Sequence, residues 1–193
     1  AKFSEQHPAP QLENPVWHIH RGQPKMTSLP VSFSLLLNLA AVCHAEVSSV
    51  VWGYVSDYAP GVTAATHPEV DRMIGYAVNY YQDLIRPTKT YRLATSDEQT
   101  HIRALMAALD ALDDEAPAED VQSAVYATGK AAGYENLREW FQCLYQVLLG
   151  QSEGPRMGSF FALYGREKTR LLLADALAGN LAEDLANNPE TSG

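Results

Sequence analysis

Apolar residues recur at intervals of three and four positions along most of this chain, and this spacing limits the fold more than any other feature. The first such stripe consists of Leu35, Leu36, Leu39 and Val42. Residues at this spacing lie on one face of an α-helix, where they can be buried against a neighbouring helix. No segment after Val31 reads as a strand, so we predict an all-α fold, a helical bundle or cage of about seven helices.

Prolines and glycines mark where these helices end. Pro60-Gly61 and Pro87 interrupt helical geometry, and Gly133 and Gly150 follow two further apolar stripes. The expected helices cover residues 33–45, 47–58, 66–86, 96–112, 117–133, 137–150 and 167–185, with a short one at 160–163. Two of them begin with the pattern of a capping box, Thr66-His67-Pro68-Glu69 and Ser96-Asp97-Glu98-Gln99.

Residues 1–30 lack this periodicity and contain five prolines, so we predict an extended arm or connector there. The helical part would then divide into residues 31–95 and 96–193. Within the arm, His18 and His20 have the spacing that places both imidazoles on one side of an extended segment, as in some metal sites. No third ligand lies nearby in the sequence, so we predict no metal site.

The formal net charge of −9 argues against a non-specific nucleic-acid binder, because such proteins need clustered Lys and Arg to neutralise phosphates. The charge is unevenly spread, however. Acidic residues concentrate between Asp110 and Asp120 and in the C-terminal tail, whereas residues 86–92 carry three positive charges and no acid. The sequence therefore allows a local basic surface on an acidic protein.

Cys43 and Cys143 lie among apolar residues and outside any CxxC pattern, so we predict two buried, reduced thiols. The chain has no run of eighteen apolar residues and no signal-peptide pattern, and we expect a cytoplasmic protein that does not bind membranes. It begins at Ala1 without a Met, which we interpret as one part of a longer protein.

The sequence lacks the motifs of common catalytic and nucleotide-binding sites, among them GxGxxG, GxSxG, HExxH and the P-loop. Asp113, Asp114 and Glu115 are adjacent carboxylates on an expected loop, where solvated charge is a better interpretation than catalysis. We therefore predict no catalytic residue.

Aromatic and basic side chains are interleaved in two places, at residues 80–92 and 156–166. Unpaired bases stack on rings and arginine planes, while Lys and Arg contact phosphates, so this mixture is typical of single-stranded RNA binding. Aromatic stripes at helical spacing more often belong to the core, however, and surface arginines are more often simply solvated. The residues alone leave both interpretations open.

Four strings resemble the C-terminal half of class I lysyl-tRNA synthetases, the kind found in archaea and some bacteria. They are PVSFSLLLNL at residues 30–39, GYAVNYYQD at 75–83 with Pro87-Thr88-Lys89 after it, LLGQ at 148–151, and GPRMGSFFALYG at 154–165. The first and last strings lie far apart, so the resemblance covers roughly residues 14 to 175.

This resemblance implies a helical stem-contact region at residues 31–95, followed by a helix cage at 96–193 that receives the anticodon loop. It also implies that the parent protein ligates lysine to tRNA-Lys, and that a separate catalytic domain of the same chain binds ATP with Mg. The signatures of that domain are absent here, since Lys25-Met26-Thr27-Ser28 lacks the second lysine of KMSKS. We therefore expect no cofactor in this chain. The expected partners are the anticodon stem-loop of tRNA-Lys and the catalytic domain, with no DNA and no membrane.

By the same resemblance, the cage would hold splayed anticodon bases between rings and arginine planes. The candidates around the glycine-rich turn are Arg156, Phe160 and Arg166, and a second, phosphate-facing group comprises Arg86, Lys89, Tyr91 and Arg92. Gly154 and Gly158 would permit close approach of the backbone. An alternative for the turn is a tight helix connection in which Arg156 caps carbonyl groups. The alternative for the whole chain is a helical protein-interaction module that does not bind nucleic acid.

Overall fold

The structure, a computed structural model, describes residues 31–113 and 116–182, which belong to one compact unit. Every regular element within these ranges is helical, so the prediction of an all-α fold is confirmed. The α-helices are α2 (Phe33–Val42), α3 (Ser48–Tyr58), α4 (Pro68–Tyr80), α5 (Ser96–Asp110), α6 (Ala118–Ala131), α7 (Leu137–Leu144), α8 (Met157–Tyr164) and α9 (Arg166–Ala178). The predicted arm, with His18 and His20, lies outside the described residues.

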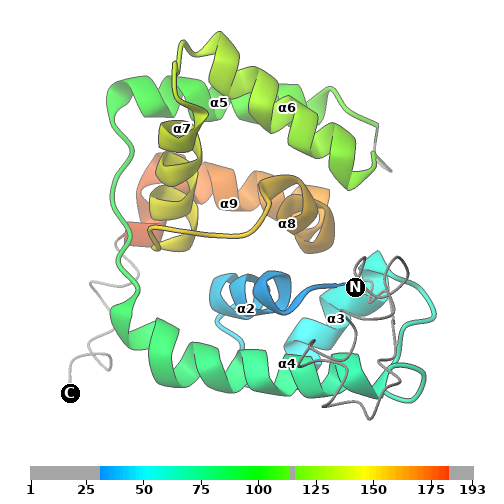
Figure 1. Cartoon of the computed structure of the whole chain (residues 1–193). Helices are drawn as coiled ribbons and strands as arrows, with labels where there is room; N and C mark the ends of the chain where they lie inside the picture. The colour runs from blue at the N-terminus through cyan, green and yellow to red at the C-terminus, as the bar shows by residue number, and fades with distance from the viewer. Residues whose placement is uncertain (1–30, 114–115, 183–193) are drawn as a thin grey trace, which may run out of the picture. The chain divides into compact units, whose positions relative to one another are not determined.

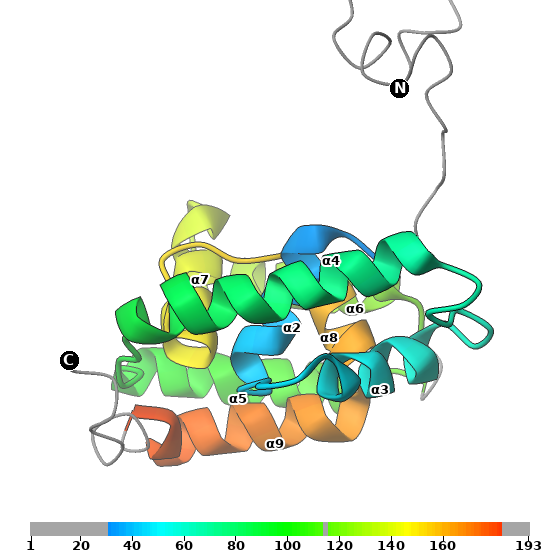
Figure 2. The ribbon, with the colours of Figure 1, turned by 90° about the horizontal axis from the view of Figure 1, so that it is seen from below.

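Helix α8 lies between the early and the late helices. In Figure 1, α5 and α6 run side by side at the top, α2, α3 and α4 lie at the bottom, and α8 and α9 lie between them. α8 packs closely against α6 on one side and against α2 and α3 on the other. Figure 2, seen from below, shows α4 in front of α2, against which it packs. α8 therefore joins α2 and α3 to α6, and a hydrogen bond from the Thr90 N–H to the Gly150 carbonyl oxygen joins residues 31–95 to the later part at a second place.

Large apolar side chains with no exposed surface fill the centre of this arrangement. They include Trp140, Phe160, Leu36, Leu39, Ile74, Ile102 and Leu144. The Trp140 indole donates a hydrogen bond of 3.0 Å to the Val125 carbonyl oxygen, which satisfies its one polar group. Burying one side chain of this size stabilises the folded state by about 1.5–3 kcal/mol. These residues belong to the apolar stripes of the sequence.

Helices α6 and α8 approach each other most closely at Gly158. Its backbone N–H donates a hydrogen bond of 2.7 Å to Oε1 of Gln122. A Cβ atom at this position would clash with the Ala118 carbonyl oxygen and would lie 2.7 Å from the Gln122 nitrogen. The contact between the two helices therefore needs a residue without a side chain.

The capping box of α5 is present, but one residue earlier than the sequence predicted. Thr95 is the N-cap, and its hydroxyl accepts from the Glu98 N–H at 3.3 Å, while the Glu98 carboxylate accepts from the Thr95 N–H at 2.9 Å. The predicted pair of Ser96 and Gln99 is wrong, because the Gln99 amide donates instead to the Ala94 carbonyl oxygen at 3.2 Å.

The capping box predicted at Thr66 and Glu69 is also wrong. Helix α4 begins with Pro68, as the sequence indicated, but its N-cap is His67 and no side chain caps it. The Thr66 hydroxyl is used inside the preceding turn, where it donates to the Gly61 carbonyl oxygen at 3.0 Å and accepts from the Thr63 N–H at 2.9 Å. Hydrogen bonds within this turn therefore compete with helix capping for the Thr66 hydroxyl.

Two helices change to π-helical geometry in their last turn. The π-helical segment η1 (Tyr81–Ile85) continues α4 and is followed by η2, a 3-10 turn at Arg86–Thr88. A second one, η3 (Tyr145–Leu149), continues α7 and ends at Gly150, which has a left-handed φ of 65°. Gly133 has a φ of 84° after α6, so its prediction as a left-handed terminator is confirmed. None of the helices in the described ranges is long and apolar enough to cross a membrane.

Candidate nucleic-acid interface

Lys89 was predicted to face phosphates, but its ammonium group lies in the protein interior. Only 7% of the residue is exposed, and Nζ donates a hydrogen bond of 2.8 Å to the Ala41 carbonyl oxygen in the last turn of α2. The ammonium also lies 4.7 Å from the centre of the Tyr91 ring. Burial lowers the pKa of Lys89 to about 7. The expectation of a phosphate contact is thus corrected. The Lys89 ammonium is buried and caps a carbonyl group in the last turn of α2, so it is not accessible to a phosphate.

Arg92 links the segment after η2 to α5 and η3. Its two terminal nitrogens donate to the two Glu98 carboxylate oxygens, each at 2.7 Å, and Nε donates to Oε1 of Gln146 at 2.7 Å. The Arg92 hydrogen bonds hold the pKa of Glu98 down at about 2. The Arg92 side chain nevertheless stays 37% exposed.

Arg86 and Tyr91 complete the first predicted group, and both are partly exposed. Arg86 lies in the short η2 turn, at the end of the π-helical segment. Tyr91 lies against the buried Lys89 ammonium. The first group therefore contributes partly exposed side chains at Arg86, Tyr91 and Arg92, but not at Lys89.

Phe160 was predicted to stack on a base, but its ring has no exposed surface. It lies between α6, α2 and α3 and stacks on Tyr164, with ring centres 5.5 Å apart. Tyr164 stacks in turn on Tyr54 of α3 at 5.5 Å, and Nζ of Lys168 lies 3.7 Å from the Tyr54 ring centre. Phe160 is corrected to a core residue, because the ring faces that a base would need are covered by protein.

Arg166 and Arg156 have different environments, although the sequence placed them in one group. The Arg166 guanidinium donates to the carbonyl oxygens of Leu112 and Asp110 at 2.6 and 2.7 Å, so it caps the C-terminal end of α5. The Arg156 side chain is 55% exposed, and its nearest acid, Glu119, lies 3.7 Å away. Of these two arginines, Arg156 has the more accessible guanidinium group.

The glycines of the predicted turn contact protein. A Cβ atom at Gly154 would lie 2.5 Å from the Tyr145 ring, and Gly158 lies against α6. The Tyr145 hydroxyl donates to the Pro155 carbonyl oxygen at 3.0 Å, which fixes this turn against η3. The close backbone approach predicted at both glycines is therefore used for helix packing.

The structure brings together a different set of rings and cations, on the outer side of α6 and α7. This α6–α7 face consists of Tyr126, Lys130, Arg138, Phe141 and Tyr145. The Tyr126 and Phe141 rings meet edge to face at 5.1 Å, and Phe141 and Tyr145 lie 6.4 Å apart. Tyr126 is 43% exposed, Phe141 and Tyr145 are half-buried, and Lys130 and Arg138 are exposed.

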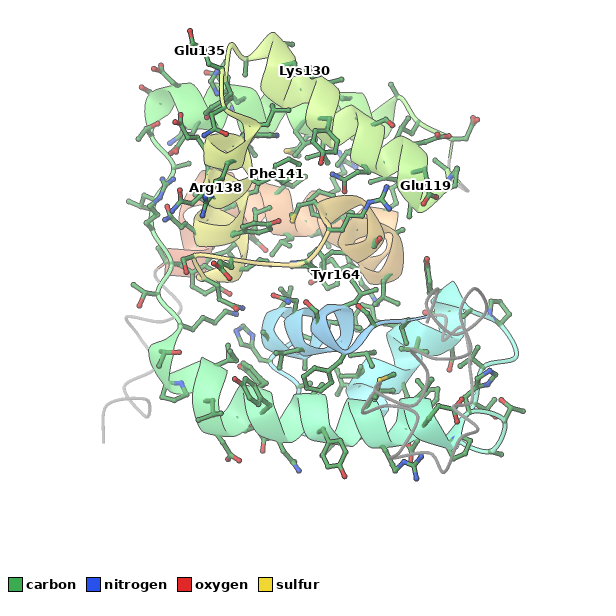
Figure 3. The ribbon with its side chains drawn as sticks, in the orientation of Figure 1. Glu119, Lys130, Glu135, Arg138, Phe141 and Tyr164 are labelled. Atoms are coloured by element: carbon green, nitrogen blue, oxygen red, sulfur yellow. The ribbon has the colours of Figure 1, made fainter. Side chains whose placement is uncertain are left out.

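Figure 3 shows how the labelled members of this face lie. Arg138 and Phe141 both extend from α7, and the Phe141 ring lies on the side of α7 that faces α6. Glu119 lies at the other end of α6 from Lys130, and Glu135 lies in the α6–α7 connection. Lys130 and Arg138 therefore lie close to the α6–α7 connection, near the acidic residues Glu135 and Glu139, and the rings lie further along the two helices.

The sequence does not reveal this face, because Phe141 lies among apolar residues at the three-and-four spacing that is typical of a helical core. Residues 140 and 141 are about 100° apart around a helix, so both cannot point fully inward. Trp140 takes the buried position, with no exposed surface, and leaves Phe141 half-buried at the edge of α7. The spacing of Arg138 to Phe141 and Tyr145, three and seven residues, was the available signal.

The metal-ligating side chains and the thiols of the described ranges can be located individually. No group of three His, Cys, Asp or Glu residues lies close enough to hold a metal ion. Both cysteines are free; Cys143 is buried as predicted, whereas Cys43 is partly exposed. Burial raises the pKa of Cys143 to about 12 and also raises that of Cys43, so neither thiol is activated as a nucleophile.

The fold and the α6–α7 face define a small all-α protein region whose most distinctive surface combines aromatic rings with guanidinium and ammonium groups. The chain is 42% identical to a lysine–tRNA ligase of Rickettsia akari (strain Hartford) over 174 residues, which are 90% of this chain and 33% of that protein. It is 43% identical to a lysine–tRNA ligase of Roseobacter denitrificans over 182 residues, 94% of this chain and 34% of that protein. No family model and no solved structure matches the chain.

The chain thus spans about a third of the length of the curated relatives it matches. At 42% and 43% identity over nine tenths of the chain or more, it resembles a region of a lysyl-tRNA synthetase. The alternative of an unrelated protein-interaction module is not favoured by these relatives.

Proposed function

We propose that this chain is the tRNA-binding, anticodon-recognising region of a class I lysyl-tRNA synthetase. In this proposal the parent protein ligates lysine to tRNA-Lys in the cytoplasm, and the catalytic domain with its ATP and Mg sites belongs to the rest of that protein. The support is the similarity of nine tenths of the chain to proteins named lysine–tRNA ligase. The absence of nucleotide-binding motifs from this sequence is consistent with that division.

The observation that carries the RNA-binding part is the α6–α7 face. An unpaired base can stack on the exposed side of the Tyr126 or Phe141 ring, which is worth about 1–3 kcal/mol per base. Arg138 and Lys130 extend from the same face, where they can contact the adjoining phosphates. Rings and cations in this arrangement suit a loop of single-stranded RNA better than a duplex.

The residues proposed to contact RNA differ in part from those expected from the sequence. Arg156 stays in the set because its guanidinium is exposed beside the first turn of α6. Arg86, Tyr91 and Arg92 stay as a second, partly exposed group near η2. Lys89 and Phe160 are left out because they are buried. Arg166 acts through α5, whose end it caps.

Binding at this region would serve a reaction that takes place elsewhere in the parent protein. The binding free energy from contacts with the anticodon loop can be used to orient the acceptor end of the tRNA in the distant catalytic domain. On this proposal the described region is a positioning device, and its loss raises the barrier to aminoacylation without removing a reacting group.

A titration with three RNAs tests the proposal. We expect the chain to bind a tRNA-Lys transcript more tightly than an anticodon-altered version and an unrelated tRNA. The affinity should also fall with salt, by a slope of about 0.7 in log K per single-stranded phosphate contact. Equal affinity for all three RNAs would remove anticodon recognition. Binding that is indifferent to salt would favour protein docking instead.

A further inference from the structure

A polar groove lies where the segment after η2 crosses the turn after η3. Its volume is about 560 Å³, and its polar lining includes Thr90, Arg92, Gln146, Gln151, Ser152 and Glu153. We propose that this groove binds one unpaired nucleotide and contacts the edge of its base. The inference rests on the proposed function and adds to it a second subsite, separate from the stacking rings of the α6–α7 face.

The groove is built from the ends of both π-helical segments. Ile85, the last residue of η1, forms its apolar part, and Gln146 of η3 lies on its wall. π-Helical turns account for well under 1% of residues in globular proteins and occur frequently at functional sites. Here two of them, from helices far apart in the sequence, end at the same groove.

Gly150 holds the two crossing segments together at the base of the groove. Its carbonyl oxygen accepts a hydrogen bond of 2.9 Å from the Thr90 N–H. A Cβ atom at Gly150 would lie 2.9 Å from Cγ of Lys89 and 3.3 Å from the Thr90 carbonyl carbon. Gly150 also has a φ of 65°, so both its backbone conformation and the lack of space for a side chain favour glycine. The base of the groove is therefore closely packed.

The groove retains hydrogen-bonding capacity that the protein does not use. The hydroxyls of Thr90 and Ser152 are exposed and make no hydrogen bond among the described residues. Oε1 of Gln146 accepts from Arg92, which fixes the amide and leaves its NH₂ group free to donate. These neutral donors and acceptors, held on two backbone segments, match the mixed donor and acceptor pattern of a base edge.

Charge and size both favour a nucleotide base over a free anion. The only cation of the lining, Arg92, is already paired with Glu98, and Glu153 adds a carboxylate, so a lone phosphate would gain little there. Pockets that hold small ligands measure about 300–1,000 Å³, and the groove falls in that range. The site therefore suits a polar, uncharged group of the size of a base.

The groove also lies at the end of the helix that carries two rings of the α6–α7 face. Tyr145 of that face packs against Phe141, and the next residue, Gln146, lines the groove. A single strand that stacks on the rings can therefore extend along α7 and place a neighbouring base in the groove. This path explains why a base, rather than an unrelated small molecule, is the proposed occupant.

The test is to block the groove with a large side chain introduced at an exposed lining residue and to measure RNA binding. Ser152→Trp places a large side chain in the groove, Thr90→Val removes one hydroxyl at nearly constant shape, and Ser56→Trp on the distant α3 is the matched control. The probe is a tRNA-Lys transcript with 4-thiouridine at one anticodon-loop position at a time. We expect Ser152→Trp to weaken binding about tenfold and Thr90→Val by a smaller factor. One loop position should crosslink to residues 146–153 in the wild type and in Ser56→Trp, but not in Ser152→Trp.

The outcomes separate the groove from the proposed function. If Ser152→Trp binds tRNA-Lys and crosslinks like the wild type while Phe141→Leu binds less well, the groove is refuted and RNA binding stands. If the wild-type chain does not bind tRNA-Lys, the proposed function fails and the groove fails with it. A Ser56→Trp effect equal to that of Ser152→Trp would also overturn the assignment, because the loss would not be local.

Discussion

Lys89 shows how burial decides what a charged side chain does in this protein. Its ammonium lies 2.8 Å from the Ala41 carbonyl oxygen, and burial lowers its pKa from 10.5 to about 7, with the nearby Cys43 thiol acting in the opposite direction. Between those pH values the unfolded chain binds a proton that the folded protein does not. The folded state therefore loses stability as the pH falls from 10.5 toward 7, and no further loss follows below 7.

We predict that Lys89→Met reduces this pH dependence. Relative to the wild type, the variant should gain stability as the pH falls through that window, by up to about 1.4 kcal/mol per pH unit. The measurement is urea unfolding of both proteins at pH 7 and pH 9, with the difference in the free energy of unfolding between them as the readout. A difference that stays constant over this range would show that Lys89 remains charged when folded.

Single residues are also where sequence reasoning reached its limit. Phe141 and Phe160 both lie in apolar stripes, and neither stripe shows which residue is covered by another helix. Phe160 is buried because α6, α2 and α3 all pack against α8, while Phe141 is left half-buried at the edge of α7. The difference comes from contacts between distant segments, which a single sequence does not display.

At the scale of elements, Glu98 is the residue on which the start of α5 depends. It completes the capping box with Thr95 and pairs with Arg92, so one carboxylate fixes both a helix end and the segment before it. The pKa of Glu98 falls from 4.5 to about 2, mainly through the hydrogen bonds from Arg92. Its contribution is complete above pH 4.5 and is lost as the pH falls through about 2.

We predict that Glu98→Gln lowers the free energy of unfolding by about 1.5–3 kcal/mol at pH 6, because a charge-assisted pair and a cap are weakened together. The loss should shrink as the pH is lowered toward 2. Chemical denaturation at pH 6 and pH 3 provides the measurement. Glu167→Gln, an exposed acid in the first turn of α9, is the control and should change stability by less than about 1 kcal/mol. Equal effects of the two substitutions would contradict this account of Glu98.

The α6–α8 contact gives a second prediction at this scale. Gly158→Ala would place a methyl group against the α6 backbone, and we expect it to destabilise the protein by about 1–3 kcal/mol or more. Gly75→Ala in α4 is the matched control, since no atom lies within 4 Å of the added group, and we expect a gain of up to about 1 kcal/mol. Thermal unfolding of both variants tests this, and a tolerated Gly158→Ala would mean that α6 and α8 do not pack this closely.

Helix positions were predictable where a local residue determines them. α3 ends at Tyr58, as Pro60-Gly61 indicated, and α4 begins at Pro68. The π-helical endings of α4 and α7 were not predicted, because Pro87 and Gly150 mark where a helix stops but not how its last turn is wound. Since both endings line the proposed nucleotide groove, this part of the candidate site lay beyond sequence reasoning.

For the molecule as a whole, periodicity predicted the all-α class but not the packing order. α8 is short and follows a glycine-rich turn, yet it contacts α2, α3, α6 and α9. A helix of eight residues has few local signals, and its position depends on nonlocal burial. The division at residues 95 and 96 remains a prediction, as does the role of the first thirty residues.

The most direct test of the central claim compares two phenylalanines in one binding experiment. We predict that Phe141→Leu weakens binding of tRNA-Lys by about fivefold or more, because a base loses its stacking partner. Phe160→Leu should lower stability and leave the affinity of the folded protein unchanged, because its ring is buried. The dissociation constants are measured by titration at low salt, at a temperature where all three proteins are folded. Unchanged affinity in Phe141→Leu, or a larger loss in Phe160→Leu, would contradict RNA binding at the α6–α7 face.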